Sequence, residues 1–255
     1  MGFEKFTFIN DFTAAGYGIS TLEDDESKPV QESGNAKLQE GAKSVKLVLG
    51  PGTGMGQGIL IKMDADGLYE PFPTEGGHVD FTVQTQEDWD LVCFARKFIE
   101  TSDNVENKRA KATVGRMSLE RLGAGPAVPL LYAFMKEKHP ELETVIEKSG
   151  KAFEDIESKD IIIQAMQHKD PLCLKVVEKF AEIFGNETGN MALKTLPYGG
   201  IYLIGGVTNG IRGHLLSEKT FLQAFKNKGR LSPVMDSFQI RVVDSQIEIG
   251  MRGCQ

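Results

Sequence analysis

Residues 45–63 read VKLVLGPGTGMGQGILIKM, a stretch in which two apolar runs flank a glycine-rich segment. The runs Val45 to Leu49 and Gly58 to Met63 are typical of β-strands, and residues 50–56 between them hold four glycines and one threonine. The pattern predicts a β-hairpin with an unusually wide turn. Its backbone N–H groups suit the oxygens of a phosphate or nucleotide, although a plain hairpin turn explains the same residues equally well.

This turn does not match the two common glycine-rich nucleotide motifs. It lacks the Gly-Lys-Ser/Thr ending of a Walker loop, and it leads into a strand rather than into the helix that follows Gly-x-Gly-x-x-Gly. A dinucleotide-binding oxidoreductase is therefore a weak alternative.

Strands and helices are interspersed along the rest of the chain. Lys5 to Ile9 is expected to form a short strand that passes at Asn10-Asp11 into a helix over Phe12 to Ile19, whereas Leu22 to Lys43 and Leu68 to Phe81 are expected to form loops. The later elements are expected to be helices over 89–100, 118–122, 126–138, 161–168, 171–194 and 217–227, a strand over 200–204, and a closing edge strand over 238–243. The interspersed order predicts an α/β fold.

Composition narrows the classes of function. The 255 residues are 40% hydrophobic and 25% charged with a net charge of −7, so they can bury a sizeable core but offer no basic stripe for nucleic acid. No apolar stretch approaches the roughly 20 residues of a membrane helix, and we expect a cytoplasmic protein without a membrane partner. The three cysteines are widely spaced, which argues against disulfides and a structural metal site.

Asn10-Asp11 is the first candidate for chemistry. It follows an expected strand, and the carboxyl ends of strands in open α/β sheets border the ligand crevice. A carboxylate there could take a proton from an alcohol that attacks a phosphoryl group. The alternative is that Asp11 only caps the helix that follows it.

The segment Glu75-Gly76-Gly77-His78-Val79-Asp80-Phe81 is the second candidate. Its two glycines would let a carboxylate and an imidazole converge on one small polar ligand. Sugar hydroxyls are both donors and acceptors, so such a mixture satisfies them well. The alternative is a tight turn with a surface histidine.

Two weaker candidates lie further along the chain. Glu120 precedes a Gly-Pro turn, and Gly205-Gly206 follows the expected strand over 200–204, where a flat ring could approach the backbone. An exposed helical glutamate and glycines required for packing are the alternatives.

Taken in order, these segments resemble the bacterial-type glucokinases over essentially the whole chain. The motifs that carry the resemblance are residues 9–14 (INDFTA), 52–56 (GTGMG), 75–81 (EGGHVDF), 118–121 (SLER) with the Gly-Pro turn after it, 189–190 (GN) and 205–207 (GGV). Each motif alone is weak, but their joint order is specific. The resemblance implies an α/β protein of the hexokinase/actin-like (ribonuclease H-like) fold.

The resemblance also implies ATP-dependent phosphorylation of the glucose 6-hydroxyl. In that scheme Asp11 is the general base, and Asn10, Glu75, His78 and Glu120 hold glucose or a similar hexose. The turn residues Gly52, Thr53 and Gly54 would contact phosphate, and Gly205 and Gly206 would contact the adenosine side. Mg²⁺ would enter with ATP, and a homodimer is expected from the resemblance alone.

One departure concerns the amino-terminal part of the family. Its members carry an Asp-x-Gly-Gly-Thr phosphate motif upstream of Asn-Asp, and this motif occurs nowhere in the 255 residues. We expect two domains, an incomplete small domain over 1–81 and a helix-rich large domain over 82–255, with the hairpin edges left unpaired. A partial chain is the favoured explanation, ahead of a short form that pairs with another chain and of a divergent enzyme.

Two other functions remain open. A non-catalytic sugar-binding or regulatory protein would keep the hydroxyl-binding residues without the nucleotide grip. A kinase of the same fold could instead act on another hexose or use another phosphoryl donor.

Overall fold

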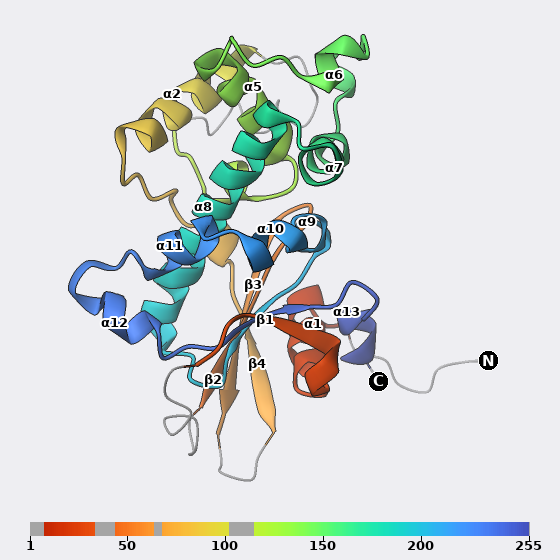
Figure 1. Ribbon diagram of the computed structural model, residues 1–255. Coiled ribbons are helices and arrows are strands. Elements are labelled where there is room, and N and C mark those ends of the chain that lie inside the picture. Colours follow the sequence, from red (N-terminus) through yellow and green to blue (C-terminus); the bar gives the residue numbers. More distant parts are fainter. Residues whose placement is uncertain (1–7, 34–43, 64–67, 102–114, 255) are drawn as a thin grey trace.

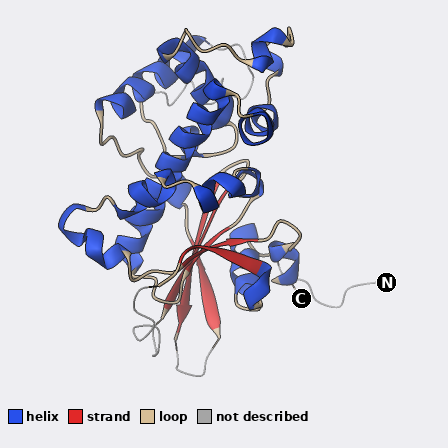
Figure 2. Ribbon diagram, in the orientation of Figure 1, coloured by secondary structure: helices blue, strands red, loops and turns tan. Residues whose placement is uncertain are grey.

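The computed structural model describes residues 8–33, 44–63, 68–101 and 115–254. Its centre is a six-stranded mixed sheet in the order β1-β6-β5-β2-β3-β4. The strands are β1 (Ser27–Gln31), β2 (Val45–Pro51), β3 (Met55–Lys62), β4 (Tyr69–Pro73), β5 (Ile201–Leu203) and β6 (Ile240–Val243). β5 runs parallel to both β2 and β6, and the other pairs are antiparallel. Helices cover both faces of the sheet (Figures 1 and 2).

The β2–β3 hairpin forms as expected and lies inside the sheet. Its register pairs Pro51 with Met55, so the wide turn closes at the end of both strands. β2 also pairs with β5, and β3 also pairs with β4. The expectation that the hairpin edges would be unpaired was therefore wrong, because β5 comes from more than 130 residues further along the chain and a local pattern does not reveal such a partner.

The hairpin is buried on both faces, which explains its run of apolar residues. Leu47 and Leu49 belong to the main core, whereas Val48 and Leu60 point to a smaller core on the opposite face. The smaller core contains Ala15 and Ile19 of α1 (Asp11–Ile19) and Ile249 of α13 (Ile249–Arg252), and both helices lie beside the sheet in Figure 1.

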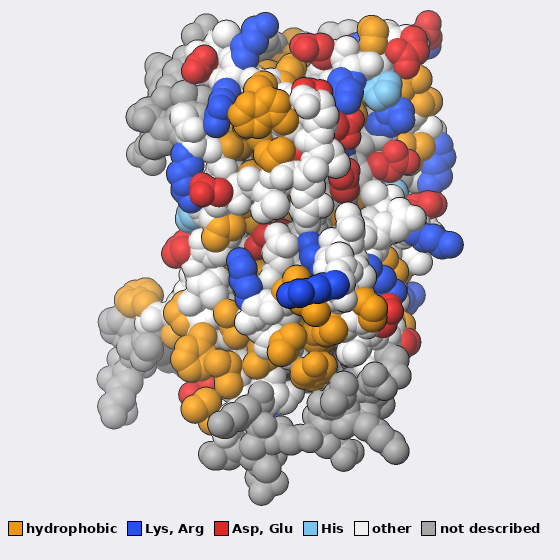
Figure 3. Space-filling view, turned by 90° about the vertical axis from the view of Figure 1, so that its left-hand side faces the viewer, with side chains coloured by type: hydrophobic (Ala, Val, Ile, Leu, Met, Phe, Trp, Pro, Cys, Tyr) orange, Lys and Arg blue, Asp and Glu red, His pale blue; other side chains and the backbone are white. Residues whose placement is uncertain are grey.

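The opposite face is covered by α8 (Pro171–Thr195) and α11 (Thr220–Lys226), and a layer of helices surrounds the far end of α8 (Figure 1). The remaining helices are α2 (Gln86–Thr101), α4 (Glu120–Gly123), α5 (Ala127–Lys138), α6 (Val145–Lys148), α7 (Ser158–His168), α9 (Gly206–Gly210), α10 (Arg212–Ser217) and α12 (Ser232–Met235). On the face in Figure 3, acidic and basic side chains are interspersed in the upper part and hydrophobic side chains gather in the lower part.

α8 is fixed at its start and along its length. Asp170 is its N-cap, and the Asp170 Oδ1 atom accepts hydrogen bonds from the backbone N–H of Leu172 and Cys173 at 3.1 and 3.0 Å. Halfway along, the Phe184 ring meets the Phe221 ring of α11 edge to face, with centroids 5.4 Å apart. This packing holds α11 against the middle of α8.

The long helices are confirmed near their expected bounds, and the differences lie in short strands and in short helices such as α6, α12 and α13, which were not expected. The expected loops over 22–43 and 68–81 contain β1 and β4. β6 is not an edge, since it lies between β1 and β5. Of the strand expected over 5–9, residues 5–7 lie outside the described residues and residues 8–9 are not in a strand.

The division into domains over 1–81 and 82–255 stays a prediction. The sheet itself takes strands from both ranges, since β5 and β6 pair with β2 and β1. Within the described ranges, no helix is both long and apolar enough to cross a bilayer.

Candidate active site

A cavity of about 260 Å³ opens at the turn end of the β2–β3 hairpin. It gathers side chains from the start of α1, the hairpin turn, the segment after β4 and the start of α4. Eight residues expected from the sequence line it, namely Asn10, Asp11, Gly52, Thr53, Gly54, Glu75, His78 and Glu120. Because these residues are spread over more than 100 positions of the chain, the fold rather than the local sequence brings them together.

The start of α1 presents the exposed carboxylate of Asp11 to the cavity. Asn10, not Asp11, is the N-cap, and its Oδ1 atom accepts hydrogen bonds from the N–H of Phe12 at 2.8 Å and Thr13 at 3.2 Å. Asp11 is the first residue of the helix and is exposed, and among the described residues its carboxylate bonds only the adjacent Phe12 N–H, at 2.9 Å. The alternative in which Asp11 caps this helix was therefore wrong. The helix dipole favours a negative charge at this position.

The hairpin turn is tied to Glu120. The Met55 N–H donates to Glu120 Oε2 at 3.0 Å, and a Cβ atom at Gly54 would lie 2.6 Å from the same oxygen. Glycine at position 54 therefore allows the carboxylate to approach the turn. A second tie joins the Gly125 N–H to the Gly52 carbonyl at 2.8 Å. The turn is held in place through backbone groups and one carboxylate.

Two donors of the turn remain available to a ligand. The Gly52 N–H is used inside the turn, where it donates to the Gly54 carbonyl at 2.8 Å. The N–H groups of Thr53 and Gly54 donate to no acceptor in the part of the chain that the structure describes. Two adjacent free N–H groups in a glycine-rich turn are suited to a phosphate oxygen.

The segment after β4 places Glu75 and His78 at the rim of the cavity. Gly77 packs so closely that a Cβ atom there would overlap the Met55 carbonyl, and Gly76 packs in the same way against the side chain of Gln57. The two glycines thus fix a 3-10 turn over Gly76–His78 against β3. Glu75 Oε2 and His78 Nε2 are 3.8 Å apart, and their side chains are 88% and 60% exposed.

Gln57 belongs to this site and was missed in the sequence. It is buried, lines the cavity, and donates its Nε2–H to Glu187 Oε1 on α8 at 3.1 Å. Its own Oε1 atom has no partner among the described residues. Burial raises the pKa of the Glu187 carboxyl, against the opposing effect of the Gln57 bond. A polar residue at an inward-facing position of an apolar strand was the signal available.

Gly205 and Gly206 do not line this cavity. Gly205 has a φ of +96° at the end of β5, and a Cβ atom there would lie 3.0 Å from the Pro51 carbonyl of β2. Its place beside the hairpin is compatible with the expected nucleotide contact, which stays a prediction.

Comparison with known proteins adds the family. The glucokinase family model matches residues 1–255. A curated glucokinase of Nostoc punctiforme is 30% identical over 253 residues, which cover 95% of this chain and 68% of that protein. This chain thus spans about two thirds of the length of that relative.

Solved structures give the same result for the fold. The crystal structure of a glucokinase from an Antarctic psychrotroph matches with a TM-score of 0.72 and 25% identity, over 96% of this chain and 66% of that chain. A ROK family glucokinase from Streptomyces griseus, solved with glucose and AMPPNP, matches with a TM-score of 0.59 and 16% identity, over 96% and 65% of the two chains. The fold is the actin-like fold of sugar kinases. The chain belongs to the glucokinase family.

Proposed function

We propose that this chain binds glucose in the cavity at the hairpin turn and that Asp11 is the general base for its phosphorylation by ATP. The observation that carries the proposal is the convergence of Asp11, Glu75, His78 and Glu120, from four separate segments, on one cavity beside a turn with two free N–H groups. Family membership and the named glucokinase relatives support glucose as acceptor and ATP as donor.

In the proposed reaction the glucose 6-hydroxyl oxygen forms a bond to the γ-phosphorus as the bond from that phosphorus to the bridging β-γ oxygen breaks. The hydroxyl proton passes to the Asp11 carboxylate, and ADP leaves with the bridging oxygen. Asn10, Glu75, His78 and Glu120 orient the sugar through its hydroxyls. Glu75 and His78 are exposed at the rim, so they can rearrange around a ligand with little loss of protein contacts.

The nucleotide would reach the turn from the side of Gly52, Thr53 and Gly54. The unused N–H groups of Thr53 and Gly54 fit a phosphate oxygen. In the described part of the chain no cluster of three or more His, Cys, Asp or Glu residues could hold a metal ion. Mg²⁺, which supplies charge neutralisation when bound, would therefore be carried by the phosphates of ATP. Gly205 and Gly206 would face the adenosine.

The test is coupled-assay turnover with glucose, ATP and Mg²⁺. Asp11→Asn should lower the turnover of the protein by about 10²- to 10⁴-fold while calorimetry shows glucose binding unchanged. The exposed Asp25, which lies outside the cavity, gives the matched control Asp25→Asn. Equal turnover in Asp11→Asn and Asp25→Asn would remove Asp11 as the base.

A second candidate function rests on the same hydroxyl-binding residues in the cavity. In that case the chain binds sugar without transferring phosphate. Glucose would then raise the melting temperature, whereas ATP with Mg²⁺ would not change it and no turnover would appear. We further propose that the protein is cytoplasmic and that it forms a homodimer. Light scattering on the purified protein would test the homodimer.

A further inference from the structure

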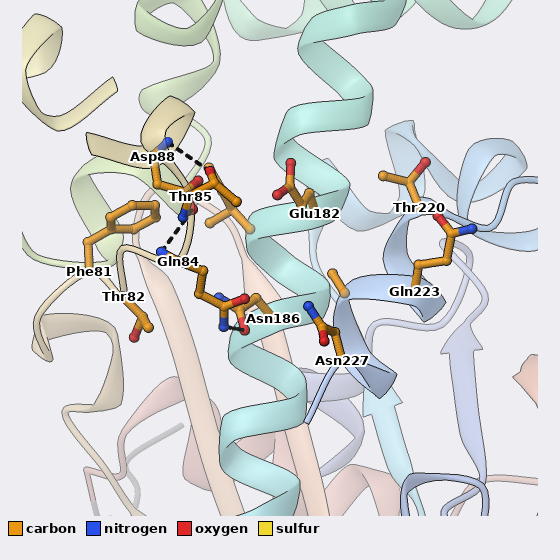
Figure 4. Close-up of a pocket in the computed structure, with 12 residues that line it drawn as sticks. Phe81, Thr82, Gln84, Thr85, Asp88, Glu182, Asn186, Thr220, Gln223 and Asn227 are labelled. Atoms are coloured by element: carbon orange, nitrogen blue, oxygen red, sulfur yellow. Dashed lines mark hydrogen bonds between the residues drawn. The ribbon is translucent and has the colours of Figure 1, made fainter. Parts of the chain in front are cut away.

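A second and larger cavity, of about 450 Å³, lies between α8, α11 and the segment that leads into α2. In Figure 4, Phe81 and Gln84 stand on one side, Gln223 and Asn227 on the other, with Asn186 of α8 between them. It shares no lining residue with the candidate active site. Its volume lies in the range of small-molecule sites, roughly 300 to 1,000 Å³.

The wall of this cavity carries polar groups that the protein leaves unused. The side chains of Thr82, Thr220, Gln223 and Asn227 make no hydrogen bond within the described ranges. Gln84 donates its Nε2–H to Asn186 Oδ1 at 2.9 Å, and its side-chain Oε1 atom accepts no hydrogen bond from the residues that the structure describes. The wall therefore offers hydroxyls and amides that can both donate and accept, beside the aromatic ring of Phe81.

The charge of the cavity selects against anions. The Glu182 carboxylate lines the cavity. The adjacent Lys179 already forms ion pairs through its Nζ atom with Asp88 at 2.7 Å and with Glu182 at 3.0 Å. Lys228, which reaches the cavity wall at Asn186, donates to Asn186 Oδ1 at 2.6 Å and to Asn190 Oδ1 at 2.9 Å. Neither lysine is available to a phosphate group.

We propose that this cavity binds a neutral, unphosphorylated sugar at a site separate from the candidate active site. Amides and hydroxyls satisfy the sugar hydroxyls, the Phe81 ring covers an apolar face of the sugar, and the Glu182 carboxylate disfavours a phosphorylated one. The proposal goes beyond the proposed kinase function and does not depend on it, since none of the residues involved takes part in phosphoryl transfer.

The two cavities are connected, and the test has to allow for this connection. From Asn186, hydrogen bonds run through Lys228 and Asn190 to Glu187, and Glu187 accepts from Gln57 in the wall of the candidate active site. A spectral change in the second cavity could therefore originate in the first. A variant that disables only the first cavity separates the two sources.

The experiment follows the side-chain amide NMR signals of Gln84, Asn186, Gln223 and Asn227 during titration with glucose and with maltose. The background is Glu75→Ala combined with Glu120→Ala, which removes two proposed sugar ligands of the first cavity. The expected result is a saturable shift of the four amides with a neutral sugar, and a much weaker response to glucose 6-phosphate. Asn227→Ala and Ala224→Phe, which delete a ligand and fill the cavity, should weaken binding at least tenfold.

The matched control is Arg230→Ala, a change at an exposed residue that does not line the cavity. It should leave the titration unchanged. Three outcomes would overturn the proposal: no amide shift up to the solubility limit of either sugar, shifts that vanish in the Glu75→Ala, Glu120→Ala background, or glucose 6-phosphate bound as tightly as glucose. If Ala224→Phe disturbs the fold, Asn227→Ala still tests the proposal, because Asn227 is exposed and its truncation leaves the fold intact.

Discussion

The contact between Gly54 and Glu120 gives a quantitative test of the candidate active site. A Cβ atom at residue 54 would lie 2.6 Å from Glu120 Oε2, whereas real Cβ contacts are essentially never under 3.0 Å. In Gly54→Ala the carboxylate must therefore move by about 0.4 Å or more, which strains its 3.0 Å bond to the Met55 N–H. A hydrogen bond to a charged group contributes about 1.5–3 kcal/mol, so if the displaced Glu120 loses about half of such a bond to the sugar, glucose binding weakens about three- to tenfold.

Calorimetry with glucose and no nucleotide measures this effect, because Gly54 is also a proposed phosphate contact and ATP would confuse the two roles. Gly250→Ala is the matched control, since a Cβ atom at residue 250 would meet nothing within 4 Å. The decisive comparison is a double-mutant cycle with Glu120→Ala. Without the carboxylate there is no collision, so Gly54→Ala should have no further effect in that background. Equal losses from Gly54→Ala with and without Glu120 would refute the reasoning.

Three further predictions concern stability, measured by urea unfolding. Lys179→Met should lower the unfolding free energy by about 3–5 kcal/mol, because it leaves the buried Asp88 carboxylate without its positive partner. The control Lys175→Met, on the same helix, should change the unfolding free energy by about 0.5 kcal/mol or less. Equal losses in the two variants would contradict this. Burial raises the pKa of Glu187 in the folded state, so the stability that Glu187 contributes should fall as the pH rises above about 4, and Glu187→Gln should gain stability relative to wild type over that range; parallel pH profiles would exclude it. Burial raises the pKa of Asp170, but hydrogen bonds from the backbone N–H groups of Cys173 and Val145 outweigh it and lower that pKa. Asp170→Ala should therefore lower the unfolding free energy by about 1–2 kcal/mol at neutral pH, and this difference should shrink as the pH falls below about 4. A difference that is constant with pH would argue against this.

The sequence predicted the site better than it predicted the sheet. The EGGHVDF segment and the hairpin turn were identifiable through the joint order of the motifs, because each of them alone also fits a plain turn. The structure places Glu75 and His78 in one cavity with Asp11 and Glu120, although the roles of these residues stay predictions. The long helices were equally clear, since a helix such as α8 repeats its apolar period over 25 residues.

The short strands could not be predicted, because their stability comes from distant partners. β1 reads SKPVQ, in which the apolar alternation is too short to distinguish a strand from a loop. It forms because it pairs with β6, more than 200 residues away, and because Gln31 donates to the carbonyls of Met235 and Phe238 at 2.8 and 2.7 Å. A local window contains neither partner.

For Asp11 the sequence left two roles open, and Gln57 was not identified in the sequence at all. Whether Asp11 caps a helix or faces a ligand depends on which residue takes the cap, and the structure gives the cap to Asn10. Whether Gln57 is a surface residue or part of the site depends on α8, which places Glu187 3.1 Å from its amide. Asn10 takes the capping role that Asp11 could have filled. Glu187 supplies the hydrogen-bond acceptor that holds the buried Gln57 amide. The role open to Asp11 or Gln57 therefore depends on the neighbouring polar group, Asn10 or Glu187. Replacing that neighbour is the most direct way to change the role of the side chain.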